Sequence, residues 1–358
     1  MMASKRYYID ARNKSTLGVT YYDACSKPHA DAERIALSMG FEPCYLYGSR
    51  LSKLGQPIWK KVLLHAYNLW YMWDVKRQAR KLKTLHGCDI FVQYGFATEA
   101  MFDVVRLLKQ GGNRLILLIH DLETFRFKDK NKAEMQMLQH IDAVIVHSEP
   151  MEKRVREIGF KGQVEKLQFF DYLNDYAIPQ DETADMVEDI KIVYAGNLSK
   201  SGFVKLLHRL PIHTRLHYNL YGVHDGTLQT NDHLHYKGVF ENDDISSIEG
   251  NWGLVWDGDS LDTCSGVTGE YLRLNAPFKF SLYLAKGLPV IVWEESAMAR
   301  YVKEYGLGIT VKGLDDIEHT IRSLTADQLA AIHHNVALYS ERVKHGAMLT
   351  DALGRCLV

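Results

Sequence analysis

The chain contains 358 residues, a length that favours two domains at roughly 150 residues per domain. Its 43 lysines and arginines nearly balance 44 aspartates and glutamates, and the net charge of −1 lacks the positive excess of a protein built to hold a nucleic-acid backbone. No apolar run approaches the roughly 18 to 20 residues that cross a bilayer, and the first residues lack the apolar core of a signal peptide. We therefore expect a cytoplasmic protein with no nucleic-acid partner and at most peripheral membrane contact.

The first half of the sequence alternates short β-rich runs with longer amphipathic segments, which is typical of βαβ units and a parallel sheet. The pattern predicts strands at 7–9, 44–47, 89–92, 115–119, 143–146 and 164–169. It predicts helices at 30–38, 59–85, 98–108, 133–140 and 150–158.

An acidic, aperiodic stretch at 171–183 predicts an exposed connection, so we divide the chain into domains 1–175 and 176–358. The second half predicts strands at 190–195, 215–221, 236–240, 254–256, 288–293 and 309–311. It predicts helices at 203–210, near 244–248, at 278–286 and 297–305, and a long terminal pair from 326 onward, with the last helix allowed to pack back on the first domain. The fold class is α/β, with two Rossmann-like domains.

Common phosphate-binding fingerprints are absent, because no G-x-G-x-x-G follows the first strand and no G-x-x-x-x-G-K-[ST] occurs. This weakens dehydrogenase and P-loop interpretations. A strand instead leads into Gly196, Asn197, Ser199 and Lys200 before a helix, where backbone N–H groups favour an anion. The alternative is an ordinary turn in which Ser199 is the helix N-cap.

A second junction spans 266–290. There we expect Asn275 to cap a helix, Pro277 to lie in its first turn, and Lys279 to project from that turn. A cation in the first turn opposes the helix dipole at a cost on the order of 0.3–1 kcal/mol unless an anion lies between them. Lys279 therefore indicates a bound phosphate, the alternative being an exposed lysine.

The chain resembles the GT-B glycosyltransferases, in which a helix leads into an A-x-G-x-P-V loop, here at 285–290. Together with Trp256-Asp257-Gly258 and the pattern at 266–285, it is similar to a bacterial family of β-1,6-galactofuranosyltransferases and of accessory glucosyltransferases that glycosylate serine-rich-repeat adhesins. Further matching segments are 119–126, 146–148 and 169–172.

The resemblance implies two Rossmann-like domains facing across a cleft, with the UDP-sugar on the second and a saccharide acceptor on the first. It implies transfer of glucose or galactofuranose to a glycan, a lipid carrier or a glycoprotein. The E-x7-E glutamate of many retaining relatives is missing at 281–283, and Glu241 and Glu249 match only the spacing. Retention of configuration therefore does not follow. Competing interpretations are a UDP-sugar epimerase and a non-catalytic nucleotide-sugar-binding or glycan-binding subunit.

Glycosyl transfer requires stabilisation of the departing diphosphate. We assign this to Lys279, Lys200 and the backbone of Gly196 and Asn197, and sugar or ribose hydroxyls to Asp257. The other candidate donor-binding residues are Thr16, Gly18, Arg126, Tyr221, Asn275 and Ser281. Asp257-Gly258-Asp259 also matches the D-x-D spelling of metal sites in another glycosyltransferase fold, but we expect neither a metal nor a cofactor. Five scattered cysteines likewise indicate no zinc site.

A base for the acceptor hydroxyl is expected at His120 and Asp121, since both follow the strand at 115–119 and histidine titrates near neutral pH. The alternative is that His120 caps a turn and Asp121 begins a helix. Arg126 either pairs with Asp121 or meets the donor phosphates. The polar loop at 12–18, which contains Thr16 and Gly18, fits a lid over acceptor or donor.

The segment at 59–73 is unusually aromatic and is followed by lysines and arginines. We favour a core helix or a subunit interface of a homo-oligomer over peripheral contact with a membrane carrying lipid-linked acceptors. The histidines at 208, 213, 217, 224, 233 and 235 show no ligand spacing, and we expect them at the surface.

Overall fold

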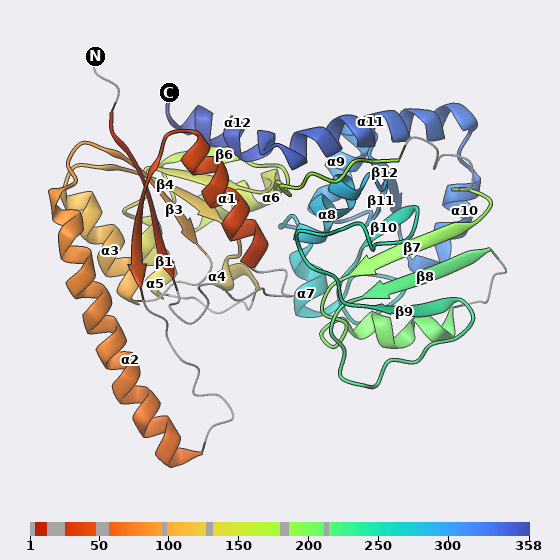
Figure 1. The fold of residues 1–358 in the computed structure, drawn as a ribbon, viewed down its shortest axis with the longest axis horizontal. Helices are drawn as coiled ribbons and strands as arrows, with labels where there is room; N and C mark the ends of the chain where they lie inside the picture. The colour runs from red at the N-terminus through yellow and green to blue at the C-terminus, as the bar shows by residue number, and fades with distance from the viewer. Residues whose placement is uncertain are drawn as a thin grey trace.

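Two six-stranded parallel sheets, each flanked by helices, lie side by side along the long axis of the computed structural model (Figure 1). The structure describes residues 4–12, 26–47, 57–94, 99–126, 132–179, 186–210 and 215–358. The strand orders are β2-β1-β3-β4-β5-β6 and β12-β11-β10-β7-β8-β9. The expected α/β class is confirmed.

The first sheet contains β1 (Arg6–Arg12), β2 (Glu42–Tyr47), β3 (Asp89–Tyr94), β4 (Arg114–Ile119), β5 (Ala143–Val146) and β6 (Gln163–Lys166). Its helices are α1 (Ser26–Ser38), α2 (Ile58–Ala79), which continues as a 3-10 helix (Arg80–Thr84), α3 (Glu99–Gln110), α4 (Glu123–Arg126), α5 (Lys132–Leu138) and α6 (Glu149–Glu157). The strand expected at 164–169 ends early, at Lys166, because Gln168 has a φ of 74° that a strand does not accommodate.

The second sheet contains β7 (Ile190–Ala195), β8 (Leu216–Tyr221), β9 (Leu234–Gly238), β10 (Trp252–Val255), β11 (Val290–Trp293) and β12 (Gly308–Val311). Its helices are α7 (Gly266–Tyr271), α8 (Phe278–Lys286), α9 (Ala297–Tyr305), α10 (Ile317–Arg322), α11 (Ala326–Lys344) and α12 (Ala347–Cys356), with 3-10 helices at Gly202–Arg209 and Leu314–Asp316. The prediction of a helix near 244–248 was wrong, because this segment forms turns. The carboxylate of Asp244 accepts hydrogen bonds from the backbone and the hydroxyl of Ser246, which favours a turn.

One continuous hydrophobic cluster joins the two halves through the residues that follow β6. The ring of Phe169 lies 5.0 Å from that of Phe280 on α8, and Tyr172 stacks on Phe278 at 5.0 Å. The last helix, α12, returns to the first sheet, where Arg355 forms an ion pair with Glu165 of β6 at 2.7 Å (Figure 1).

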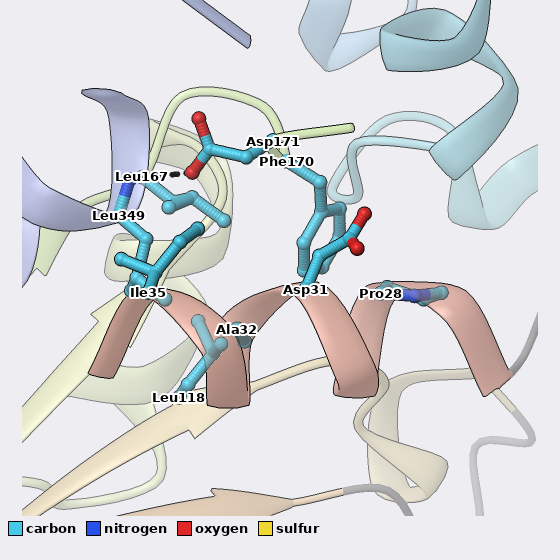
Figure 2. Close-up of a pocket in the computed structure, with 9 residues that line it drawn as sticks. All are labelled: Pro28, Asp31, Ala32, Ile35, Leu118, Leu167, Phe170, Asp171 and Leu349. Carbon is cyan, nitrogen blue, oxygen red and sulfur yellow. Dashed lines mark hydrogen bonds between the residues drawn. The ribbon is translucent and has the colours of Figure 1, made fainter. Parts of the chain in front are cut away.

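Buried charges also connect the halves. Lys27 of α1 is buried and donates to Asp31 at 3.2 Å, to the Leu173 carbonyl at 2.9 Å and to Asp243 of the second half at 2.8 Å. Asp171 accepts hydrogen bonds from the backbone of Met348 and Leu349 at the start of α12. Figure 2 shows Asp31 and Asp171 beside a cavity of about 10 Å³, which has room for about one water molecule.

The segment at 59–73, which was expected to form a core helix or a subunit interface, forms part of α2 and is only partly buried. Its second half contributes Tyr71 and Val75 to the core, whereas Ile58, Trp59, Val62 and Leu63 of its first half are exposed. Among the described residues, no helix is long and apolar enough to cross a membrane.

Candidate functional site

The segments that follow the carboxyl ends of the two sheets meet one another. After β4, the backbone N–H of Leu122 donates to the hydroxyl of Tyr271 on α7 at 3.0 Å. After β5, the hydroxyl of Ser148 donates to the Leu274 carbonyl at 2.6 Å. Ligands of α/β proteins bind at the carboxyl ends of strands, so this junction is the candidate site.

Lys279 lies at the centre of the second half of this junction. Its ammonium donates to both carboxylate oxygens of Asp257 at 3.1 and 3.2 Å, to the Tyr194 hydroxyl at 3.1 Å and to the Trp256 carbonyl at 3.1 Å. Burial and the nearby Asp257 raise the pKa of Tyr194 well above its usual value, so its hydroxyl remains neutral. The ammonium is therefore fixed at the ends of β7 and β10.

Gly196 lies next to this ammonium, since a Cβ added at Gly196 would be 3.9 Å from the Lys279 nitrogen. The side chain of Asn197 accepts hydrogen bonds from the backbone of Ser199 and Lys200, and the side chain of Lys200 is exposed. Ser199 was wrong as an N-cap, because the following 3-10 helix has Ser201 at that position. Gly196, Asp257 and Lys279 are brought together, with Asn197 and Lys200 on the adjoining turn.

Asp257 already supplies an anion beside Lys279, so the position of this lysine does not by itself indicate a bound phosphate, contrary to expectation. Pro277, and not Asn275, occupies the N-cap position of α8, and the preceding Ala276 donates its backbone N–H to His147 of the first half. The Oδ1 atom of Asn275 is buried and has no hydrogen-bond partner among the described residues. Asn275 therefore presents an unpaired acceptor at the junction.

Two side chains that were predicted to bind the donor, Tyr221 and Ser281, form hydrogen bonds with backbone groups instead. The Tyr221 hydroxyl donates to the Ser247 carbonyl at 3.2 Å and accepts from the Glu249 backbone at 2.9 Å. Ser281 is fully buried and donates to the Phe170 carbonyl at 2.6 Å. Their hydroxyls hold the fold together, and this corrects the expectation that they bind the donor. Arg126 ends α4, while Thr16 and Gly18 lie outside the described residues.

His120 is part of a buried stack in the first half of the junction. Its Nε2 lies 2.7 Å from Gln93 Oε1, and its ring lies 3.8 Å from that of His29 and 5.2 Å from that of Phe170. Burial lowers the pKa of His120 well below its usual range, and the neighbouring His29 and His147 lower it further. This environment argues against the expectation that His120 meets an acceptor, because its ring is buried between those of His29 and Phe170. Asp121 is half-buried in the same segment.

His29, at the start of α1, was not predicted as a site residue from the sequence. Burial lowers the pKa of His29, while the negative charge of Asp10 on β1 and a hydrogen bond with Gln93 oppose this shift. Gln93 in turn donates to the His29 carbonyl at 2.9 Å and to the Tyr8 hydroxyl at 2.7 Å. The polar residues of β1 and β3 near their carboxyl ends were the available signal.

His147 connects the two halves as a neutral imidazole. Its Nε2 donates to the Ile119 carbonyl at 2.7 Å, and its Nδ1 accepts from the Ala276 backbone at 3.1 Å. Burial lowers the pKa of His147 to about 4, which keeps Nδ1 available as an acceptor near neutral pH. The conformation of the 274–276 segment thus depends on this ring.

Across the ranges that the structure describes, no group of three or more histidine, cysteine, aspartate or glutamate residues is arranged to hold a metal ion. The Asp257 carboxylate of the D-x-D spelling is engaged by Lys279. His217, His233 and His235 are half-buried rather than at the surface, and His217 lies 5.1 and 5.6 Å from the other two rings because β8 and β9 are neighbours.

Comparisons with known proteins agree with this architecture. The Glucosyltransferase 3-like N-terminal domain matches residues 7–169 and the C-terminal domain of the same family matches 192–356. The β-1,6-galactofuranosyltransferase WbbI of Escherichia coli K12 is 30% identical over 253 residues, which cover 69% of this chain and 72% of that protein. Glucosyltransferase 3 of Streptococcus gordonii is 24% identical over 240 residues, covering 65% and 67%.

Among solved structures, a UDP-forming α,α-trehalose-phosphate synthase from Burkholderia vietnamiensis superposes with a TM-score of 0.57 at 10% identity, covering 99% of both chains. This likeness shows the fold. The expected GT-B architecture is confirmed, and the chain belongs to the glucosyltransferase 3-like family of glycosyltransferases.

Proposed function

We propose that the protein transfers a hexosyl residue from a UDP-sugar to a saccharide acceptor on a glycan, a lipid carrier or a glycoprotein. The observation that carries the proposal is the Lys279 ammonium fixed beside Gly196 at the strand ends. The names of the relatives support glucose or galactofuranose as the transferred sugar. Family membership favours this activity over epimerisation.

The donor diphosphate would lie against Lys279 and the N–H groups of the 196–200 turn. During transfer the bond between the anomeric carbon and the diphosphate oxygen breaks, and the electron pair leaves with UDP. Lys279 stabilises this charge electrostatically, with Asp257 fixing the ammonium or accepting a sugar hydroxyl. We propose that no metal is needed, because the Lys279 ammonium would supply a fixed cation beside the departing diphosphate.

The acceptor oxygen forms the new bond to the anomeric carbon and loses its proton to a base. We place this role on His29, whose ring is stacked on His120 and whose protonated form is favoured by Asp10. Asp121 is the second candidate. The side chains of His120 and Gln93 would then position the base.

The test is acceptor-dependent release of UDP from UDP-glucose and UDP-galactofuranose, measured across a panel of saccharide acceptors. His29→Gln or Asp121→Asn is expected to retain UDP binding and to lose transfer, while the exposed His334→Gln serves as the control. Conversion of the nucleotide sugar without any acceptor would support the epimerase alternative. UDP binding without turnover of any sugar, in a chain with retained partner binding, would support a non-catalytic subunit.

A further inference from the structure

Residues 272–277, which connect α7 to α8, belong to the second half by sequence but are held by the first half. The hydroxyl of Ser148 donates to the Leu274 carbonyl at 2.6 Å, and the Ala276 backbone N–H donates to Nδ1 of His147 at 3.1 Å. His147 and Ser148 directly follow β5, and both are buried. The position of this connection is therefore set from the interior of the first half.

The connection leads directly into the first turn of the helix that carries Lys279. Ala276 is followed by Pro277, whose ring fixes its φ, here −63°, and the Phe280 backbone N–H donates to the Pro277 carbonyl at 2.9 Å. Lys279 lies within this turn, and its ammonium reaches Asp257. Because the turn is rigid, a displacement of Ala276 is passed on to Lys279.

The other nitrogen of the same imidazole is bonded on the side of the proposed base. Nε2 of His147 donates to the carbonyl of Ile119, the residue that precedes His120, at 2.7 Å. The ring of Phe170 lies 4.8 Å from that of His147 and 5.2 Å from that of His120, which stacks on His29 at 3.8 Å. His147 therefore supports the group of rings that contains His29.

The two nitrogens of His147 thus hold two different parts of the site. The neutral tautomer with its proton on Nε2 satisfies both backbone groups at once. We propose that His147 is a positioning residue: Nε2 places the acceptor base, and Nδ1 places the lysine that receives the donor diphosphate. This role rests on the proposed function, because it assumes the tasks given to His29 and Lys279.

A purely structural role of His147 would have different consequences. Loss of a residue that only stabilises the fold lowers the fraction of folded molecules, and it reduces turnover without changing the UDP affinity of those that remain folded. A positioning role separates affinity from turnover according to which nitrogen is lost.

Two substitutions each retain one of the two hydrogen bonds. His147→Asn places a carbonyl oxygen where Nδ1 lies and still accepts from Ala276, but its side chain is too short to reach the Ile119 carbonyl. We expect UDP affinity within about twofold of the original and about tenfold slower turnover at saturating donor, since small misplacements of a reacting group are costly.

His147→Gln retains a donor that reaches the Ile119 carbonyl, but it leaves the Ala276 N–H without its acceptor. We expect about fivefold weaker UDP binding, in the range by which residues that link two sites alter their coupling, and turnover at saturating donor within about twofold of the original. The matched controls are His333→Asn and His333→Gln on α11, where Nε2 is buried without a partner among the described residues. They should change neither quantity.

The measurements use the full chain. Calorimetry gives the UDP affinity, and the number of UDP sites per chain from the same titration gives the folded fraction. Turnover is UDP release from UDP-glucose and from UDP-galactofuranose with water alone as the acceptor probe. The water oxygen then bonds to the anomeric carbon and its proton passes to the base.

Opposite effects of the two variants, at an unchanged number of UDP sites, would support the positioning role. Equal effects of both variants on affinity and turnover, no effect of either, or a loss of turnover matched by a loss of UDP sites would overturn it. Failure of the proposed function is distinguishable, because the original chain itself would then neither bind UDP nor release it from either sugar nucleotide.

Discussion

Replacement of Asp171 by asparagine tests the buried connection between the two halves. Asp171 is 4% exposed and accepts from the backbone of Met348 and Leu349, which begin the helix that returns to the first sheet. Burial raises the pKa of Asp171 from 3.8 to about 7, against the opposing effect of the two backbone hydrogen bonds. Asparagine keeps an acceptor oxygen but removes the titration.

The sign and size of the effect follow from this pKa. Between pH 3.8 and about 7 the folded chain binds more protons at this carboxyl than the unfolded chain does, so the free energy of unfolding falls as pH rises. One pKa unit corresponds to about 1.4 kcal/mol, and from pH 5 to pH 8 the carboxyl removes about 3 kcal/mol of stability. Asp171→Asn therefore gains that amount relative to the original chain over this interval.

The assay is urea unfolding followed by tryptophan emission at pH 5, 6, 7 and 8 for both chains. The pH dependence of His147 occurs in both chains and cancels in the difference, whereas the charge of Asp31 raises the pKa of Asp171 and is therefore part of the effect that the difference measures. Asp225→Asn is the matched control, because hydrogen bonds lower the pKa of this exposed carboxyl and it stays ionised across the whole interval. A stability difference between Asp171→Asn and the original chain that stays constant from pH 5 to pH 8 would show that the pKa of Asp171 is not raised by folding.

Two further substitutions test the buried ion pair between Lys27 and Asp31 and the 196–200 turn. Lys27→Met leaves Asp31 buried without the Lys27 ammonium and should lower the free energy of unfolding by about 3 kcal/mol in a urea denaturation assay. The double variant Lys27→Met/Asp31→Leu should recover most of this loss. Lys205→Met, which breaks an exposed ion pair, should change the free energy of unfolding by less than about 1 kcal/mol in the same assay. Gly222→Ala places a Cβ against the carbonyl oxygen of Gly196 at a φ of 134°, so calorimetry should show at least tenfold weaker UDP binding. Gly226→Ala, whose Cβ meets nothing within 4 Å, should bind UDP normally, and equal affinities of the two variants would contradict the role of this contact.

Regular elements were predictable where burial and helix termination act locally. The run at 115–119 is fully buried in β4, and α8 ends at Gly287, whose φ of 84° suits glycine. The residues at 244–248 were misread because their side chains bond to their own backbone, which spacing does not reveal. The short α7 was missed because Gly266 and Gly269 weaken its helical signal.

The candidate site was predictable as a location but not as a set of contacts. Lys279 and Asp257 were each predicted because they lie near the ends of strands. Their ion pair could not be predicted, because it depends on how β10 and α8 are placed relative to each other. His120 was found by the same rule, but its burial beneath His29 depends on how α1 packs across the sheet. The spacing of the aromatic residues in α2 predicts that they share one face of the helix. It does not show whether that face packs against the protein or faces solvent.

Calorimetric titration with UDP in the presence of EDTA, with ADP and GDP for comparison, tests whether Lys279 and the 196–200 turn bind the donor diphosphate without a metal. We expect UDP to bind more tightly than ADP or GDP, and EDTA to leave its affinity unchanged. Lys279→Met should weaken UDP binding at least tenfold, because a hydrogen bond to a charged group contributes about 1.5–3 kcal/mol. Lys200→Met, on the exposed part of the same turn, should have the smaller effect. Absence of UDP binding, or an unchanged affinity in Lys279→Met, would contradict the account.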